Sequence, residues 1–318
     1  MLKIYNTDIK TGETSKQKEI TKGCWINLVE PTEEEIKTVC EKTKMSDEFI
    51  KYALDYEEKA RIDTDDDGNV LFVVDVPILE KEHGENTTDV YTTMPVGLIV
   101  VRDDFFITVS LKKNRIISNL EASAKKKIVT YKKTRLIFQF FYENASIFLR
   151  LLKEINKETE VAESILKKTL QNRELLKLLN SEKSLVYFTT SLKSNEVVME
   201  KTLRGKIIKL YEEDEDLLED AIVENKQAIE MSKIYSDILN GSMDAYASII
   251  SNNLNGVMKM LTSITIILAI PTLIASMWGM NVPVPWQYSN WGFPILCVTM
   301  VAVTVFTIVW LKVRNLLS

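Results

Sequence analysis

The run MLTSITIILAIPTLIASMWGMNVPVPWQYSNWGFPILCVTMVAVTVFTIVWL, from Met260 to Leu311, contains no Asp, Glu, Lys or Arg. A helix that crosses the hydrocarbon core of a bilayer needs roughly 20 predominantly apolar residues. Two such segments, about 257–278 and 293–311, flank a polar, Pro-rich loop. Because a charge at mid-membrane costs roughly 2.5 to 3.5 kcal/mol, the absence of charge over this length predicts two transmembrane helices.

The flanking charges predict the orientation of these helices. Lys259 precedes the first helix and Lys312 and Arg314 follow the second, whereas the connecting loop is uncharged. The positive-inside bias therefore places both chain ends in the cytoplasm of a multi-pass protein of the cell (inner) membrane. The start, MLKIYNTDIK, has no apolar signal region, so we expect the N-terminal part to stay in the cytosol. Tryptophans near the interfaces are Trp278, Trp286, Trp291 and Trp310.

The remainder of the chain has the composition of a charged, soluble region. The 318 residues carry a net charge of -5, and no basic face with interleaved aromatics indicates nucleic acid as a partner. The three cysteines form no CxxC pair, and no GxxxxGK[ST] loop is present, so neither a zinc site nor ATP-driven pumping is indicated. We expect no enzyme activity and no organic cofactor.

Two structural patterns precede the apolar run. Residues 1–112 combine β-rich runs with short helices and predict a cytosolic α/β domain; the runs are Cys24–Val29, Val70–Leu79, Met94–Val101 and Phe105–Ser110. Pro31 and Thr32, followed by acidic residues, mark a helix start. Residues 113–259 repeat apolar positions three and four apart and predict a long α-helical stalk, which leaves 260–318 as the two-span transmembrane domain.

Two motifs at the first span resemble the CorA family of magnesium channels. The span ends in Trp278-Gly279-Met280-Asn281, and the family is defined by Gly-Met-Asn at this place. Asn255-Gly256-Val257-Met258-Lys259-Met260-Leu261-Thr262 is similar to the family's pattern at the inner end of the same helix. The resemblance implies a CorA-like homopentamer in which five copies of the first span line a pore through the lipid bilayer.

The resemblance also assigns roles to residues of this chain. It implies that Gly279, Met280 and Asn281 form the selectivity motif, with Asn281 as the outer site, and that Met258 and Leu261 form an apolar gate. Magnesium dehydrates reluctantly, so a ring of neutral amide oxygens suits its water shell. The pore-lining and gate residues are Asp244, Asn255, Met258, Leu261, Thr265, Thr272 and Ser276.

A regulatory metal site is implied in the cytosolic region. In the family, carboxylates between neighbouring cytosolic domains bind magnesium and hold the channel closed, which indicates Asp220, with Glu224 in the same acidic run, as regulatory ligands. The partner position aligns with Tyr52, which leaves Asp55 or the cluster Asp65, Asp66, Asp67 as substitutes.

We therefore expect passive influx of Mg²⁺, with Co²⁺ and Ni²⁺ as further substrates, closed by cytosolic Mg²⁺. Mg²⁺ is then both substrate and regulatory ligand.

One alternative is a zinc-type transporter of the same superfamily, against which Met280 and the single histidine, His83, argue. Another is a membrane-anchored interaction or signalling protein. That alternative explains the stalk, but gives no reason for the polar positions that follow one face of the first span, which helix packing alone could also produce.

Overall fold

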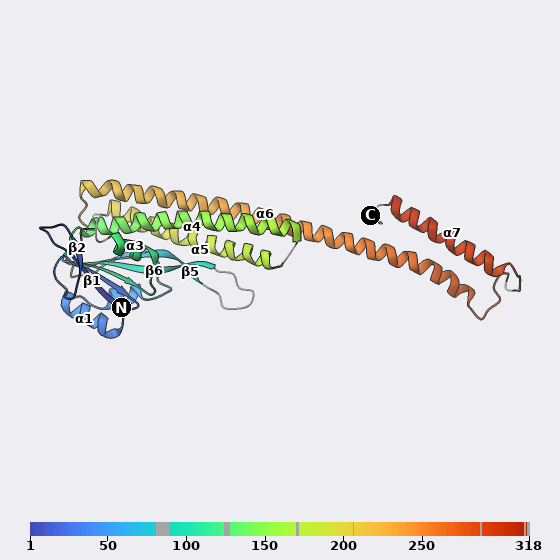
Figure 1. Cartoon of the computed structure of the whole chain (residues 1–318), viewed down its shortest axis with the longest axis horizontal. Helices are drawn as coiled ribbons and strands as arrows, with labels where there is room; N and C mark the ends of the chain where they lie inside the picture. The colour runs from blue at the N-terminus through green and yellow to red at the C-terminus, as the bar shows by residue number, and fades with distance from the viewer. Residues whose placement is uncertain are drawn as a thin grey trace. The chain divides into compact units, whose positions relative to one another are not determined.

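The computed structural model describes residues 1–80, 90–123, 128–169, 172–205, 207–286, 288–314 and 316. The chain forms two compact units, Met1–Asn240 and Gly241–Ser318, and helix α6 contributes to both (Figure 1). The strands are β1 (Leu2–Thr7), β2 (Thr14–Gln17), β3 (Trp25–Val29), β4 (Arg61–Thr64), β5 (Val70–Glu80), β6 (Val90–Val101) and β7 (Phe105–Ser110). The helices are α1 (Glu33–Thr43), α2 (Glu48–Ala53), α3 (Arg115–Ser123), α4 (Lys133–Thr169), α5 (Asn172–Arg204), α6 (Glu212–Trp278) and α7 (Gly292–Val313).

The first unit is built on a seven-stranded sheet with the order β2-β1-β3-β7-β6-β5-β4. Strands β3 and β7 pair in parallel, and the other neighbours pair antiparallel. The long central strands β5 and β6 consist mainly of buried branched and aromatic residues, as expected for strands covered on both faces. The predicted α/β fold is confirmed, although β6 begins at Val90 rather than at Met94, and β1, β2 and β4 were not predicted.

Helices cover both faces of this sheet (Figure 1). Alternate residues of β5 point to opposite faces, so Leu71 and Val73 belong to the core beneath α1 and α2. Phe72 meets Phe141 of α4 on the other face, with the ring centroids 6.3 Å apart. A Cβ atom on Gly97 of β6 would lie 2.5 Å from the Cβ of Ala53, so a glycine is needed where α2 crosses the sheet.

The helical stalk that the sequence predicts over residues 113–259 is divided into α3, α4, α5 and the first part of α6. The break between α4 and α5 has neither proline nor glycine, so the sequence pattern does not reveal it. Helices α4 and α5 pack through an edge-to-face pair of Phe148 and Phe188, with centroids 4.9 Å apart. The side-chain amide of Asn225 in α6 donates to the Leu192 carbonyl of α5, and the Ser232 hydroxyl donates to the Leu185 carbonyl. The partners run in opposite order along the two helices, so the first part of α6 lies antiparallel to α5.

The second unit consists of the C-terminal part of α6, a loop, and α7. Both helices are long and apolar enough to cross a membrane, and in their most apolar windows only 6% and 11% of the residues are buried. The hydroxyl of Ser263 donates to the carbonyl of Leu316 at 2.9 Å, so α7 returns antiparallel to α6 (Figure 1). Pro271 lies inside α6 without ending the helix. The two predicted C-terminal apolar helices are confirmed.

Candidate functional site

The residues that the sequence predicts to line a pore lie on one face of α6. Their spacing is close to whole turns of a helix with 3.6 residues per turn, so their side chains form one stripe along the helix. All of them are exposed in the single chain. This polar stripe, as we call it, consists of Asp244, Asn255, Met258, Leu261, Thr265, Thr272 and Ser276.

Two hydroxyl groups of the polar stripe donate back to the helix. Thr265 Oγ1 donates to the Leu261 carbonyl at 2.9 Å, and Thr272 Oγ1 donates to the Leu268 carbonyl at 2.8 Å. A hydroxyl has one hydrogen and two lone pairs, so each oxygen keeps acceptor capacity after this bond. The stripe therefore presents acceptor oxygens, which suit the water shell of a cation better than that of an anion.

A groove follows the outer half of the stripe within the second unit. Thr265, Thr272 and Ser276 line it together with Leu268, Leu273 and Met280. Hydroxyl groups and apolar side chains thus alternate on a surface that the described part of the chain leaves open. Closer to the N-terminal end of the stripe, Met258 and Leu261 are 52% and 57% exposed. A constriction at these two residues would require several copies of α6.

The Gly279-Met280-Asn281 motif lies directly beyond the end of α6. The Gly279 amide donates to the Ala275 carbonyl at 3.0 Å, which extends the last helical turn by one residue. Met280 and Asn281 are exposed, so the Asn281 amide is available at the end of the polar stripe. A Cβ atom at position 279 would meet carbonyl oxygens at 3.4 and 3.6 Å, which is ordinary contact, so the single chain does not demand a glycine there.

The carboxylates proposed to bind a regulatory metal lie on α6 in the first unit. Asp220 is exposed and Glu224 is half-buried. Among the residues that the structure describes, no group of three His, Cys, Asp or Glu side chains is placed to hold a metal ion. A metal site at Asp220 would therefore need ligands from a second copy or from outside the described residues, where His83 also lies.

Two of the substitutes considered for the partner of Asp220, Asp65 and Asp67, are engaged near the β4–β5 turn. The Asp65 carboxylate accepts a hydrogen bond from the Asn69 amide at 2.8 Å. Asp67 forms an ion pair with Arg102 at 3.1 Å. Tyr52 lies under the Arg61 guanidinium, 4.9 Å from its ring centroid. These contacts give each side chain a local role within the α/β domain.

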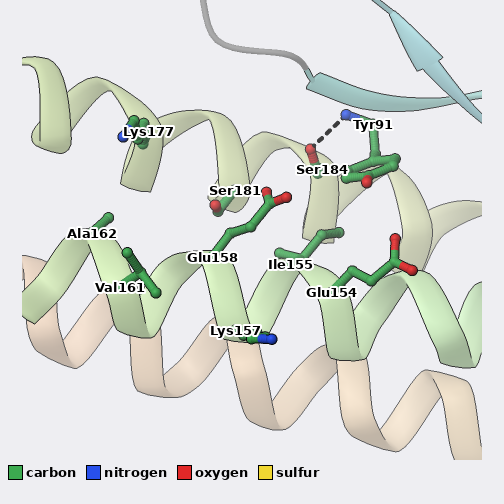
Figure 2. A pocket seen from close by; sticks show the side chains of 10 residues that line it. All are labelled: Tyr91, Glu154, Ile155, Lys157, Glu158, Val161, Ala162, Lys177, Ser181 and Ser184. Carbon is green, nitrogen blue, oxygen red and sulfur yellow. Dashed lines mark hydrogen bonds between the residues drawn. The ribbon is translucent and has the colours of Figure 1, made fainter.

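A cavity of about 680 Å³ lies between α4, α5 and β6 in the first unit. Figure 2 shows the Glu158 carboxylate pointing toward Ser181, and the Tyr91 backbone amide donating to Ser184 Oγ at 3.0 Å. Glu154 and Glu158 line the cavity together with Lys157 and Lys177. Acidic and basic side chains thus both line the cavity, and the Lys177 ammonium is paired with Glu174 at 3.0 Å. A lining of mixed charge does not indicate a cation site.

The sequence prediction did not single out Asp75, which joins the sheet to two helices. Its backbone amide donates to Asn195 Oδ1 at 2.9 Å, and its carbonyl accepts from the Asn195 and Asn144 side chains at 2.8 and 2.9 Å. Burial raises the pKa of its carboxyl to about 6, and a hydrogen bond from Ser191 partly opposes this. An aspartate within the apolar run Val70–Leu79 was the sequence feature that could have revealed this junction.

Comparison with known proteins extends the likeness over almost the whole chain. The family described as CorA-like Mg²⁺ transporter protein matches residues 21–312. A cobalt/magnesium transport protein CorA from Methanocaldococcus jannaschii is 27% identical over 289 residues, which cover 88% of this chain and 86% of that protein. A protein of the same name from Thermotoga maritima is 32% identical over 177 residues, which cover 52% of this chain and 47% of that protein.

The three-dimensional likeness agrees with the sequence match. The complete structure of the CorA magnesium transporter from Methanocaldococcus jannaschii superposes with a TM-score of 0.83 at 25% identity, covering 98% of this chain and 97% of that chain. The agreement therefore includes the sheet, the long helices and the two apolar helices. This chain belongs to the family of CorA-like Mg²⁺ transporter proteins.

Proposed function

We propose that this chain forms a channel through which divalent cations, Mg²⁺ above all, enter the cell passively. The observation that carries the proposal is the polar stripe, which is exposed along α6 and leads to Asn281. The Methanocaldococcus jannaschii and Thermotoga maritima relatives are named cobalt/magnesium transport proteins, so we include Co²⁺ as a substrate, and we add Ni²⁺ as a third divalent ion.

The channel is proposed to be an assembly of identical copies, a homopentamer by resemblance to the family. Two helices in one chain are too few to enclose a water path, and an anchor alone would need only apolar side chains facing lipid. An assembly that brings the α6 stripes together would hide the hydroxyl oxygens from lipid. Both chain ends then lie in the cytoplasm, with residues 1–112 as the α/β domain, 113–259 as the stalk and 260–318 in the membrane.

The proposed selectivity residue is Asn281, supported by Gly279 and Met280. Mg²⁺ prefers six oxygens in near-octahedral geometry and keeps its waters, so neutral amide oxygens can bind the hydrated ion and still release it. Asn255, Thr265, Thr272 and Ser276 continue this lining inward. Met258 and Leu261 are the proposed apolar gate, and Asp244 lies at the cytosolic mouth.

The decisive experiment is a flux measurement in liposomes that contain a magnesium-sensitive dye. We expect Mg²⁺ influx with the wild type, a large loss with Asn281→Ala, and wild-type influx with the matched control Asn290→Ala, an exposed asparagine in the same loop. Wild-type protein that gives no more influx than empty liposomes would refute the channel. Uptake of Zn²⁺ without Mg²⁺ would instead favour the zinc-type alternative.

The gating proposal is that cytosolic Mg²⁺ bound at Asp220 and Glu224, between neighbouring copies, favours the closed state. Each site contributes only its differential affinity for the two states, roughly 1 to 3 kcal/mol, so several copies must act together. We expect Mg²⁺ to protect the wild type from proteolysis and Asp220→Ala to need more Mg²⁺ for the same protection. Asp216→Ala, one turn earlier and also exposed, is the control. Unchanged protection in Asp220→Ala would remove Asp220 from the regulatory site.

A further inference from the structure

Gly292, the first residue of α7, is buried where the loop between the two apolar helices closes. A Cβ atom at this position would lie 2.6 Å from the backbone oxygen of Trp286 and 3.0 Å from Cη2 of the Trp278 ring. Real Cβ atoms essentially never come within 3.0 Å of a heavy atom outside their own residue and its chain neighbours. Any larger residue at position 292 would therefore displace the loop backbone, the Trp278 indole, or both.

The loop holds the Trp286 carbonyl in this place. The Ser289 amide donates to the Trp286 oxygen at 3.0 Å, and the Gly292 amide donates to the Ser289 oxygen at 3.0 Å. Trp286 itself has a φ of 58°, a left-handed conformation that bulky side chains rarely adopt. The close approach of Gly292 to Trp286 is therefore part of a hydrogen-bonded turn, and the contact with Trp278 follows from it.

Trp278 connects this turn to the selectivity motif. It is the last residue of α6 and is half-buried, whereas Met280 and Asn281 directly after it are exposed. Trp278, Gly279 and Gly292 line one small pocket together with Leu296 of α7. The packing of the Trp278 indole against Gly292 thus sets the point at which the chain leaves the helix and enters the motif.

We propose that Gly292 is a positioning residue for Gly279-Met280-Asn281, which seats the Trp278 indole and so fixes where the Asn281 amide is presented. The inference rests on the proposed function, in which Asn281 meets the hydrated ion. The motif alone places the selectivity site at the end of α6. The inference adds Gly292 of α7 to that site.

Helix propensity and steric contact make opposite predictions for Gly292→Ala. Alanine is the better helix former, so propensity alone predicts unchanged or greater stability. The contacts of Gly292 predict a displaced motif instead. Gly241 on α6 provides a matched control, because a Cβ atom there would meet nothing within 4 Å. Gly241→Ala therefore reports the propensity effect without the steric one.

The test compares wild type, Gly292→Ala and Gly241→Ala in liposomes that hold equal amounts of assembled protein. Initial influx is measured against Mg²⁺ concentration, and Mg²⁺ influx is compared with Ca²⁺ influx. We expect Gly292→Ala to raise the half-saturating Mg²⁺ concentration about tenfold and to lower the Mg²⁺ over Ca²⁺ ratio, because sub-ångström displacement of a pre-organised site has effects of this order. Gly241→Ala should match the wild type.

A second variant keeps the test decisive if Gly292→Ala does not assemble. Trp278→Phe adds no atoms and removes the ring carbons that face Gly292, so it should shift the half-saturating concentration in the same direction by a smaller factor. When the two substitutions are combined, the smaller ring leaves room for the added methyl group. The double variant should therefore have a half-saturating Mg²⁺ concentration closer to the wild-type value than Gly292→Ala alone.

The inference is overturned if the assembled Gly292→Ala protein has the wild-type half-saturating concentration and ion discrimination. If Gly292→Ala does not assemble, the inference is overturned when Trp278→Phe has the wild-type values. These outcomes would leave the channel itself intact, provided that the wild type conducts and Asn281→Ala does not. Absence of wild-type flux would instead refute the proposed function.

Discussion

The two units of the chain use the same kinds of apolar side chain in opposite ways. In the first unit, Phe148 and Phe188 are fully buried against each other between α4 and α5. In the second, Phe306 of α7 is 70% exposed, and the apolar windows of α6 and α7 are almost entirely uncovered. The first unit is stabilised by its own core. The second leaves most of its apolar side chains uncovered within the single chain.

The largest expected effect on stability, and the first test of this comparison, is that of removing a buried aromatic ring from the first unit. Phe148→Ala should lower the free energy of unfolding of the first unit by about 3 to 5 kcal/mol, because it removes a buried ring and leaves a cavity. Denaturant unfolding of the full chain in detergent measures this change. Phe306→Ala on α7 is the control, and an equal loss in that variant would contradict the difference between the units.

A charge at an exposed valine tests the second unit. Val301 on α7 and Val223 on α6 within the first unit are both 64% exposed. If lipid covers only Val301, Val301→Lys should cost roughly 2.5 to 3.5 kcal/mol of insertion free energy, whereas Val223→Lys should insert normally. Resistance of the membrane-bound protein to alkaline extraction measures insertion. Equal extraction of the two variants would mean that α7 does not lie in lipid.

The parts of the fold that were predicted correctly are those in which the local pattern matches the final environment. The two apolar segments in the run without charge from Met260 to Leu311 are each long enough to be recognised by composition alone. The runs at Val70–Leu79 and Phe105–Ser110 are apolar because both faces of the sheet are covered. The break between α4 and α5 was missed because the sequence has no proline or glycine there.

The candidate site was predictable only where a motif or a helical spacing marks it. The polar stripe follows from spacing along one helix, and Asn281 follows from the motif. The contact between Gly292 and Trp278 joins two helices through a loop, so no pattern within either segment reveals it. The Asp75 junction was missed for a similar reason, since its partners Asn144 and Asn195 are distant in sequence.

Asp75 gives the first unit a pH dependence that can be measured. Its pKa is raised from the ordinary 3.8 to about 6, so the folded state binds the proton more tightly than the unfolded state does. The contribution of Asp75 to the free energy of unfolding should therefore be fully present below about pH 4, fall as pH rises from about 4 to 6, and then stay low. Asp75→Asn should remove this contribution to the slope and raise stability at pH 7 by about 3 kcal/mol.

Stability measured against pH in the wild type, Asp75→Asn and the exposed control Asp66→Asn checks this prediction. The control should retain the wild-type slope. An Asp75→Asn variant with an unchanged slope would show that another group is responsible.

The smallest effect concerns the start of α1, where the sequence predicted a helix at Thr32. Thr32 Oγ1 accepts from the Glu35 amide at 3.3 Å, and Glu35 Oε2 accepts from the Thr32 amide at 3.0 Å, which together form a capping box. The same carboxylate also binds the N-terminal amine at 2.9 Å and the Leu2 amide at 2.8 Å. The cap therefore joins β1 to α1 as well as starting the helix.

Thr32→Ala should lower the stability of the first unit by about 1 kcal/mol, the usual cost of removing such a cap, while Thr32→Ser should retain most of it. Hydrogen exchange at the first turn of α1 and at β1 is the sensitive measurement, because both depend on Glu35. Exchange within α7 should not change, since that helix is stabilised by its surroundings and not by this core. Faster exchange in α7 would show that the two units unfold together, and the contrast between them would then have to be abandoned.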